Sequence, residues 1–492
     1  MSDRNPRTLR TTGALSMLLV AVLGTGCASR ATYVRPADPP QTRYESAAGV
    51  KTSLTGTAGH SVPQVSFGDG PSDAWWTLLG SEQINRLVSL ALSNNQSLAS
   101  AQAHLAAARE RIRAARGAWY PQVDATLAAQ RTRYGAPVLG SLAKDFPPYS
   151  AYTAGPTVSY DLDLFGGTRS RVEQAAAGAQ FESARLDAVA LTVSGNIVIE
   201  ALQIAALRAQ IRVAQGIIAD DEHSLTLIRA AREAGAVSQM DVLSAQSQTD
   251  HDRTLLPPLQ QELSVAQAVL TSLIGAAPSD WTAPDVDLED LKLAEHLPVA
   301  LPSELVHRRP DIDAAEAQLH AASAALGIAT ANLYPQFTLS AAIGEQGLLG
   351  GGSSETALNI LGGLTAPIFH GGALTAERRA AQDEYRAAFA AYRQTVLEAF
   401  SQVAAALQAL GNDAASLSTQ QQALQSADAS LALTRQAYAA GNAGYVQVLD
   451  AQRLHEQAQL GEVQADCQRY VDAVKLLLAA GGRVGLSRAD QP

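Results

Sequence analysis

The chain has 492 residues and a net charge of −11, because 47 aspartates and glutamates outnumber 36 lysines and arginines. This acidity argues against a nucleic-acid partner, which needs a basic surface on the protein. The two cysteines of the chain are too few for a disulfide framework.

Residues 1–26 form a predicted secretory signal, in which three arginines precede a short apolar segment and small residues lead up to Cys27. A cysteine in this place is similar to the acylated cysteine of bacterial lipoproteins, and Ala28 after it favours the outer membrane. A plain secretory signal with an incidental cysteine is the alternative, because Gly24 occupies the place of the usual large aliphatic residue. Residues 27–74, rich in Pro, Gly, Ser and Thr, are predicted to form an extended N-terminal arm.

Two stretches of the chain alternate apolar and polar residues in the manner of β-strands. Residues 157–164 do so in the first half, and residues 337–343 in the second. Each half offers two strand-like segments joined by a loop, at residues 131–149 and at residues 344–355. One apolar and one polar side fit a wall between two media, and they fit a half-buried strand of a soluble protein as well.

A seven-residue apolar repeat runs without proline through residues 371–440. Its positions are Phe389, Val396, Val403, Leu410, Leu417, Leu424, Leu431 and Tyr438. A second row, four residues before each of these, is mixed and includes Asp413. A strict heptad imposes a left-handed supercoil, and about seventy residues at ~1.5 Å per residue give a helix of roughly 100 Å. Such a helix has to pack sideways against other long helices.

The same pattern occurs about 206 residues earlier, and its flanking motifs recur in the same order. Its positions are Ala190, Ile197, Ile204, Ile211, Ile218 and Leu225. We therefore predict two structural repeats, each made of a helix, a strand pair and a long helical hairpin. The predicted segments are repeat 1 (75–280), a linker (281–300), repeat 2 (301–482) and a C-terminal tail (483–492). Gly235 and Gly441 are predicted to form the hairpin turns with positive φ.

Four strands in one chain leave two open sheet edges. An open edge is forbidden in lipid, so strands that cross a membrane must close into a barrel. The pattern therefore predicts that several copies of the chain close the sheet around an axis. No stretch after residue 26 has the ~18 uninterrupted apolar residues of a membrane helix.

Four motifs carry a family resemblance. They are Trp75-Trp76, Leu-Ile-Gly-Ala-Ala-Pro at 273–278, residues 301–319 with Arg308-Arg309-Pro310-Asp311-Ile312, and Val-Leu-Asp-Ala-Gln at 448–452. Together they resemble the outer membrane factor family, and more narrowly the TolC-like lipoproteins of the NodT group that serve RND-type efflux systems. The resemblance extends from Cys27 to about Gly481.

This resemblance implies an α+β membrane protein. It implies a homotrimer with a shared twelve-stranded β-barrel, four strands from each chain, that continues into a periplasmic α-helical coiled-coil tunnel. The implied partners are a periplasmic adaptor (membrane fusion) protein, an inner-membrane RND-type transporter and the lipid of a Gram-negative outer membrane. The implied function is passive export of small molecules such as drugs and toxic compounds, with no cofactor beyond a covalent lipid on Cys27.

The resemblance also assigns residues to a pore constriction at the periplasmic tip. Asp450 matches the constriction, and Val446 lies one turn before it. Three copies of Asp450 around one axis would form an acidic ring that admits cations, and Val446 would form an apolar neck. Gln447 replaces a further acidic residue of some relatives, and Ser244 matches Asp450 in the first repeat, so the ring is not duplicated. A solvated carboxylate near the turn is the alternative for Asp450.

No catalytic constellation is present in the sequence. The tight cluster Asp250-His251-Asp252 is predicted to lie on the outer, polar side of a helix, as a solvated group rather than a metal site. The zinc and serine-hydrolase motifs are absent, no metal site is predicted, and Cys467 is expected to be a small buried residue.

Two other functions fit the pattern. One is a lipid-anchored periplasmic helical scaffold or adaptor, and the other is an outer membrane channel for protein secretion or polysaccharide export. Adaptors usually have one helical hairpin flanked by domains of many short strands, whereas this chain has two hairpins that each follow a strand pair.

Overall fold

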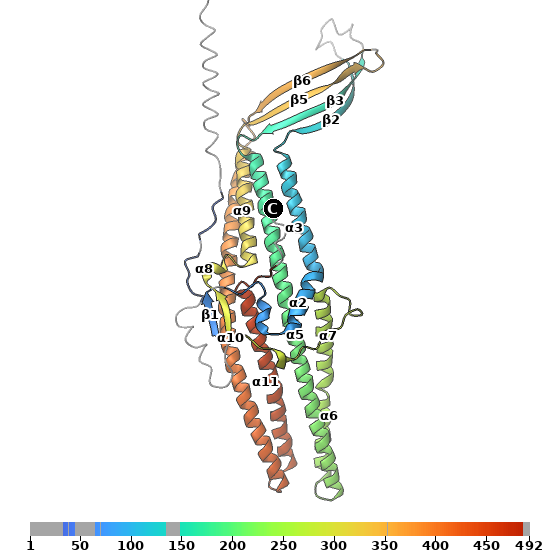
Figure 1. The fold of residues 1–492 in the computed structure, drawn as a ribbon, viewed down its shortest axis with the longest axis vertical. Coiled ribbons are helices and arrows are strands. Elements are labelled where there is room, and N and C mark those ends of the chain that lie inside the picture. The colour runs from blue at the N-terminus through green and yellow to red at the C-terminus, as the bar shows by residue number, and fades with distance from the viewer. Residues whose placement is uncertain are drawn as a thin grey trace, which may run out of the picture. The chain divides into compact units, whose positions relative to one another are not determined.

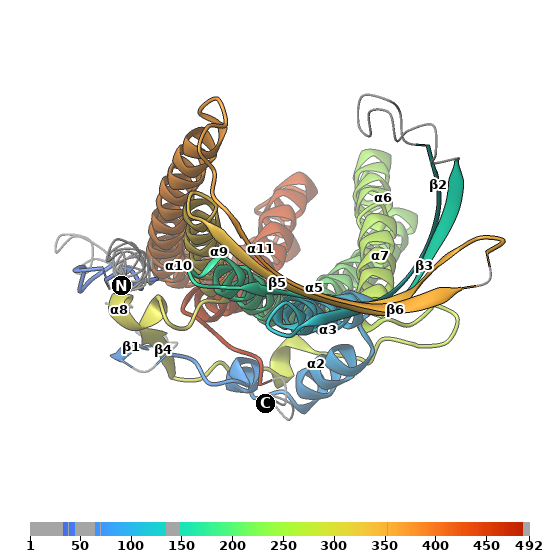
Figure 2. The same ribbon diagram turned by 90° about the horizontal axis from the view of Figure 1, so that it is seen from above.

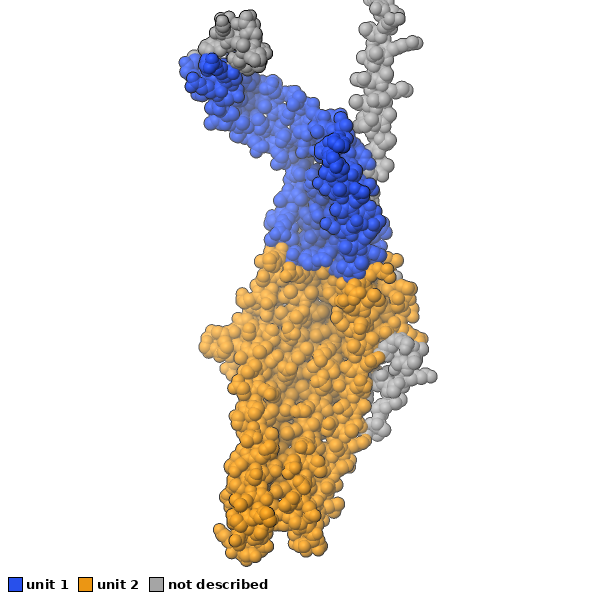
Figure 3. Space-filling model, turned by 180° about the vertical axis from the view of Figure 1, so that it is seen from behind, with its two compact units in different colours: residues 1–36, 105–182, 315–392 blue, residues 37–104, 183–314, 393–492 orange. Residues whose placement is uncertain are grey.

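The structure is a computed structural model that describes residues 33–37, 39–44, 64–68, 70–133, 148–351 and 353–485 (Figure 1). Cys27 and the predicted signal lie outside the described residues. The chain divides into two compact units, coloured separately in Figure 3. Unit 1 comprises residues 1–36, 105–182 and 315–392, and unit 2 comprises residues 37–104, 183–314 and 393–492. Each unit takes residues from both sequence halves, so the units are not the two predicted repeats.

Unit 1 contains a four-stranded antiparallel sheet with the order β2-β3-β5-β6. Its strands are β2 (Gln122–Thr132), β3 (Tyr149–Leu162), β5 (Gln336–Leu348) and β6 (Ser354–Thr365). Figure 2 shows the sheet as a curved band. The prediction of a loop at residues 344–355 was too long, because Glu345 pairs with Ala154 and extends β5 to Leu348.

Two long helices of 67 residues each follow the strand pairs, and neither is interrupted by proline. They are α5 (Gly167–Glu233) and α10 (Ala373–Ala439). The chain returns through α6 (Gln239–Arg253) and α7 (Leu256–Ile274) after α5, and through α11 (Tyr445–Ala479) after α10. Pro257 and Pro258 lie in the first turn of α7, directly after the break between α6 and α7, because proline is accepted in the first turn of a helix but not inside it.

The heptad rows form much of the core of unit 2. Val403, Leu410 and Leu417 of α10 are buried, and so are Ile197 and Ile204 of α5. Helix α5 also contains an 18-residue window with a mean hydropathy of 1.6, of which 56% is buried in the structure. By length and composition alone this window could cross a membrane, but its burial is that of a helix packed in a protein core.

Shorter elements complete the described chain. They are η1 (Trp75–Leu79), α2 (Glu82–Asn94), α3 (Gln96–Gly117), η3 (Leu288–Asp290), α8 (Pro302–Leu305) and α9 (Pro310–Ala331). Two strands were not predicted: β1 (Gln64–Gly68) in the arm pairs in parallel with β4 (His296–Ala300) in the linker. Neither segment shows a clear alternation, and the two partners lie far apart in the chain, so no local pattern predicts their pairing.

The Arg-Arg-Pro-Asp-Ile motif acts as a polar connection inside unit 2. The buried Arg309 guanidinium donates to both carboxylate oxygens of Asp311, at 3.0 and 2.7 Å. It also donates to the Ala479 carbonyl oxygen at the end of α11 and to the Gln402 side chain of α10. One arginine thus joins the start of α9 to two other helices, which gives a physical reason for this residue order.

The two hairpin turns have the geometry predicted for them. Gly235 and Gly441 have φ values of +78° and +76°. The Gly441 N–H donates to the Tyr438 carbonyl oxygen and the Asn442 N–H to that of Ala437, at 2.9 and 2.8 Å, the bond pattern of a Schellman helix end.

Replacing Gly441 with alanine is expected to lower the free energy of unfolding by about 1–2 kcal/mol, because a Cβ is strained at positive φ. The thermal midpoint of the purified protein measures this. Gly178→Ala is the matched control, since a methyl group on this helical glycine would lie in open space and alanine favours helix by up to ~1 kcal/mol. Equal effects of both substitutions would contradict the assignment.

Candidate functional site

The register of the sheet in unit 1 separates apolar from polar residues across all four strands. Phe337 pairs with Leu162 on β3 and with Leu364 on β6, and this one face continues over the sheet. Its other apolar members include Val123, Leu127, Val158, Tyr160, Leu339, Ile343, Leu358 and Ile360. We call this surface the apolar sheet face.

The opposite face of the same sheet is mainly polar. It includes Asp124, Ser159, Ser340 and Asn359, and the Thr338 hydroxyl donates to the Asp161 carboxylate at 2.8 Å. A sheet with this composition separates an apolar medium from an aqueous one. The predicted alternation is therefore confirmed on all four strands, with exceptions toward the loop ends and on β6. Leu348 and Leu361 lie on the polar face, and Arg131 and Glu345 lie on the apolar one.

The apolar sheet face is not covered by any other part of the described chain. Leu127 is 81% exposed and Ile360 is 78% exposed. Within the described residues, β2 pairs only with β3 and β6 only with β5, so both outer strands present unpaired backbone groups. Soluble proteins rarely expose an apolar surface of this extent together with two open edges.

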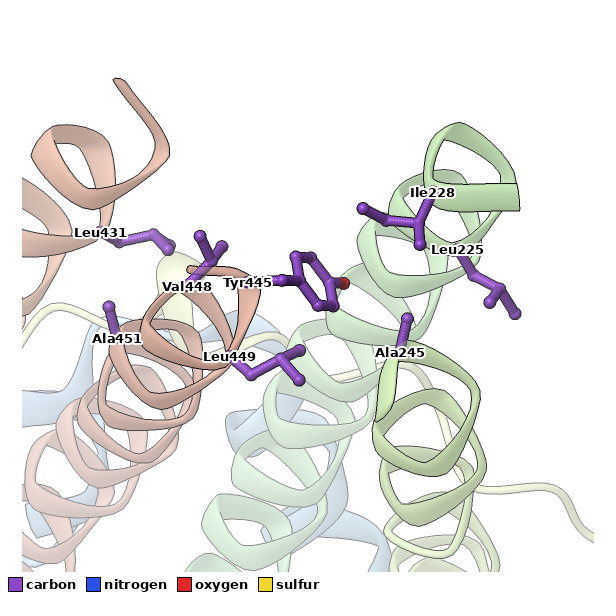
Figure 4. Packing of buried hydrophobic residues seen from close by; sticks show 8 residues of the cluster. All are labelled: Leu225, Ile228, Ala245, Leu431, Tyr445, Val448, Leu449 and Ala451. Carbon is purple, nitrogen blue, oxygen red and sulfur yellow. The ribbon is translucent and has the colours of Figure 1, made fainter. Parts of the chain in front are cut away.

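The second candidate region lies in unit 2, next to the hairpin turns. A cluster of buried apolar residues packs the two hairpins together there (Figure 4). Its members are Leu225, Ile228, Ala245, Leu431, Tyr445, Val448, Leu449 and Ala451. Figure 4 shows the Tyr445 ring of α11 pointing toward Ile228 of α5. Burial, followed by the nearby Asp221 carboxyl, raises the pKa of Tyr445 to about 12, so this phenol is neutral in the folded protein.

The structure places the two predicted constriction residues on the exposed side of the same helix start. Val446 is 58% exposed, and the Asp450 side chain is 62% exposed. Asp450 forms an ion pair with Arg453, one helical turn on, at 3.5 Å. Gln447 has a different role, because its side-chain oxygen accepts from the Gly444 backbone N–H and caps α11. Asp241 caps α6 in the same way through Ser238.

Three buried carboxyl groups meet where α5, α6 and α11 pack together. They belong to Asp221, Asp252 and Glu456. The prediction of a solvated Asp250-His251-Asp252 group is therefore wrong for Asp252, which is only 2% exposed, and holds for the exposed Asp250 and His251. Burial, the Asp252 carboxyl and Glu456 raise the pKa of Asp221 to about 8, and burial and Asp252 raise that of Glu456 to about 7.

Comparison with known proteins identifies the family. The model of the outer membrane efflux protein family matches residues 87–276 and 301–482, which is most of the chain. The chain belongs to this family. Its members are outer membrane components of efflux systems, which agrees with the apolar sheet face.

Two curated relatives illustrate the similarity to other outer membrane efflux proteins. The pyoverdine export outer membrane protein OpmQ of Pseudomonas aeruginosa is 32% identical over 441 residues, which cover 86% of this chain and 92% of OpmQ. The outer membrane protein OprJ of the same species is 30% identical over 489 residues, covering 95% of each chain. Among solved structures, the outer-membrane channel OprN superimposes with a TM-score of 0.81 and 25% identity, over 92% of this chain and 99% of OprN.

These findings confirm the predicted family, the outer membrane location and the role in efflux, and they exclude an enzyme. An efflux channel conducts its cargo and does not transform it. Cys467 is buried as predicted, and burial raises the pKa of its thiol to about 11, so it is not a reactive thiolate.

A second carboxyl pair joins α10 to α11 within unit 2. Burial and a hydrogen bond with Asp472 raise the pKa of Asp413 to about 7. Burial opposes the ionisation of Asp472, but hydrogen bonds from Lys475 and Gln468 outweigh it and lower the pKa of Asp472. At pH 6 the protonated Asp413 therefore donates to the ionised Asp472. In the sequence, the only sign of this pair is Asp413 itself, an acidic residue in the mixed second row of the heptad.

Stability is expected to fall as the pH rises through the range set by Asp413. The folded state holds a proton on Asp413 up to about pH 7, whereas the unfolded chain releases it near 3.8. The unfolded state therefore binds fewer protons over this range, and the free energy of unfolding decreases with pH. The thermal midpoint, measured from pH 5 to pH 8, is expected to fall less steeply in Asp413→Asn than in the wild type.

Asp383→Asn is the matched control for this titration, because Asp383 lies on the same helix, is exposed and pairs with Arg386. Its slope should equal that of the wild type. A slope that is equally reduced in both variants would show that the effect comes from net charge and not from the carboxyl pair.

Proposed function

We propose that three copies of this chain form an outer membrane channel. Each copy contributes its four strands to one barrel of twelve, and the long helical hairpins of the three copies form a tunnel in the periplasm. The channel passively releases small molecules that an inner-membrane RND-type transporter delivers through a periplasmic adaptor protein.

The exposed apolar sheet face is the observation that carries this proposal. Its large aliphatic residues, such as Leu127 and Ile360, are suited to contact with lipid, and the polar face with Asp124 and Asp161 is suited to a water-filled lumen. The open edges at β2 and β6 supply the hydrogen-bonding groups that neighbouring copies would pair. Neither the exposed apolar face nor the open edges would serve a purpose in a soluble scaffold.

The class of cargo is proposed from the relatives. One is named for pyoverdine export and another, 30% identical and covering 95% of this chain, is named a toluene efflux pump outer membrane protein. Both cargoes are small molecules, which favours small-molecule efflux over protein secretion.

Two further assignments belong to this proposal. The exposed Asp450 and Val446 would face the channel axis, where three aspartates form a cation-attracting ring and three valines an apolar neck. Cys27 would carry the covalent lipid that adds a membrane anchor to the barrel. One curated relative, SilC of Salmonella typhimurium, is named a probable outer membrane lipoprotein and is 27% identical over 478 residues.

The assembly can be tested by separating outer membranes on a detergent gel with and without boiling. We expect a heat-sensitive band at three times the chain mass in the wild type and in Cys27→Ser, because the barrel holds the copies together without the lipid. Labelled palmitate should enter the wild type and not the variant. A monomer that salt or Cys27→Ser releases from the membrane would support the scaffold instead.

The constriction can be tested by single-channel recording in planar bilayers. Asp450→Asn is expected to reduce the preference for cations and to weaken block by multivalent cations several-fold, because the ring loses its charge. Asp250→Asn is the matched control, since Asp250 is similarly exposed and also pairs with an arginine three residues on. Unchanged selectivity and block in Asp450→Asn would remove this residue from the pore.

A further inference from the structure

The three carboxyl groups of Asp221, Asp252 and Glu456 form a compact site inside the packed hairpins. Their side chains come from α5, α6 and α11, and the residues are 4%, 2% and 6% exposed. One carboxyl oxygen from each lies within 4.8 Å of the others. The predicted role of the chain as a conduit does not use these groups.

Polar contacts satisfy this site only in part. The Gln452 amide donates to Asp221 Oδ1, and the Gln248 amide donates to Asp252 Oδ2 at 2.8 Å. Glu456 Oε1 is buried and has no hydrogen-bond partner. Asp221 Oδ2 has no donor partner either, because a hydrogen bond between Asp221 and Asp252 requires a proton on one of the two carboxyl groups. Buried polar atoms are almost always partnered, and a cation is one of the few ligands that would satisfy ionised carboxylates here. Within the described chain, none of the three carboxylates forms an ion pair with a basic side chain.

The chemistry of the three groups indicates which ion would satisfy them. Carboxylates alone, without histidine or cysteine, are the ligands of hard divalent cations. Calcium accepts irregular sites built from several protein oxygens, whereas magnesium demands near-ideal octahedral geometry and usually keeps several waters. A buried site that offers three carboxyl groups and little room for water is therefore better suited to calcium.

We propose that Asp221, Asp252 and Glu456 bind one calcium ion per chain and that this ion ties α11 to the hairpin of α5 and α6. The ion would supply the unpartnered oxygens with a ligand and neutralise most of the buried charge. Since each hairpin contributes at least one ligand, the bound ion stabilises the packing between the hairpins rather than either hairpin alone.

A groove provides access to the site from solvent. It has a volume of about 360 Å³, and both Glu456 and Gln452 line its wall. Asp220 and Asp428 line it as well, and the Asp428 side chain is 73% exposed. Arg435 and His455 line the same groove, and His455 lies 3.7 Å from Asp428, so the groove offers an aqueous route to Glu456 rather than an acidic funnel.

The full-length protein, purified from membranes in detergent and freed of metal with a chelator, can be titrated with calcium chloride by calorimetry. We expect one calcium ion per chain, a rise of several degrees in the thermal midpoint, and at least tenfold weaker binding of magnesium chloride. Asp252→Asn should bind calcium at least tenfold more weakly and lose the thermal shift. Glu456→Gln, a second variant of the same size as the wild-type residue, should do the same.

Two controls separate this site from other acidic groups. Asp250→Asn removes an exposed carboxylate two residues from Asp252, and Asp383→Asn removes an exposed carboxylate of α10. Both should bind calcium as the wild type does, and a metal-free thermal midpoint shows that each variant is folded. Absence of calcium binding by the wild type, or equal binding by folded Asp252→Asn, would overturn the proposal and leave the channel function unaffected.

Discussion

Backbone hydrogen bonding along the two outer strands is the constraint on which the proposed channel depends. β2 and β6 have no further strand partner in the described chain, and the apolar sheet face between them is exposed. Exposure of the apolar face to water costs free energy, and so does exposure of the open edges to lipid. A single copy is therefore unsuited to either medium. Pairing of β2 with β6 of a neighbouring copy would satisfy the open edges, and only then could the apolar face enter lipid without cost, so insertion of the sheet and assembly of the copies are expected to be coupled.

Two kinds of interaction hold the helices of unit 2 together, namely the burial of aliphatic side chains and a few specific polar contacts. The heptad rows of α5 and α10 bury aliphatic side chains such as Ile204 and Val403, but a repeat of seven residues tolerates sliding by whole heptads. The polar contacts do not repeat. Arg309 meets Gln402 and the end of α11, and Asp413 meets Asp472, each at one place only. We infer that apolar burial holds these helices together while the buried polar contacts select one register.

The sequence predicted those features that a local pattern records. Heptads, alternating strands and turn glycines depend on residues near one another, and Gly235 and Gly441 adopt the expected positive φ. The pairing of β1 with β4 joins segments more than 200 residues apart, so no local pattern reports it. Asp252 was misplaced because its neighbours are polar. A helix turns by about 100° per residue, so Asp252 points away from Asp250 and into the core. The roles of Asp450 and Val446 rest on a position in the assembly, which one chain cannot display.

The buried carboxyl groups are costly in a protein that performs no chemistry. Well-packed apolar residues at such positions are often as stabilising as buried charges, or more so. Asp221 and Glu456 avoid part of this cost by holding protons near neutral pH, and the proposed cation, bound only to the packed arrangement, would compensate the three groups when they are ionised. At about a hundredfold excess over its dissociation constant, such a ligand adds about 2.7 kcal/mol to the bound state. Because this term depends on ion concentration, the packing of α11 against α5 and α6 would respond to the medium, whereas the apolar cluster around Tyr445 would not. In such a channel, the packing between the hairpins would depend on the ion concentration of the medium, and this response would need no catalytic group.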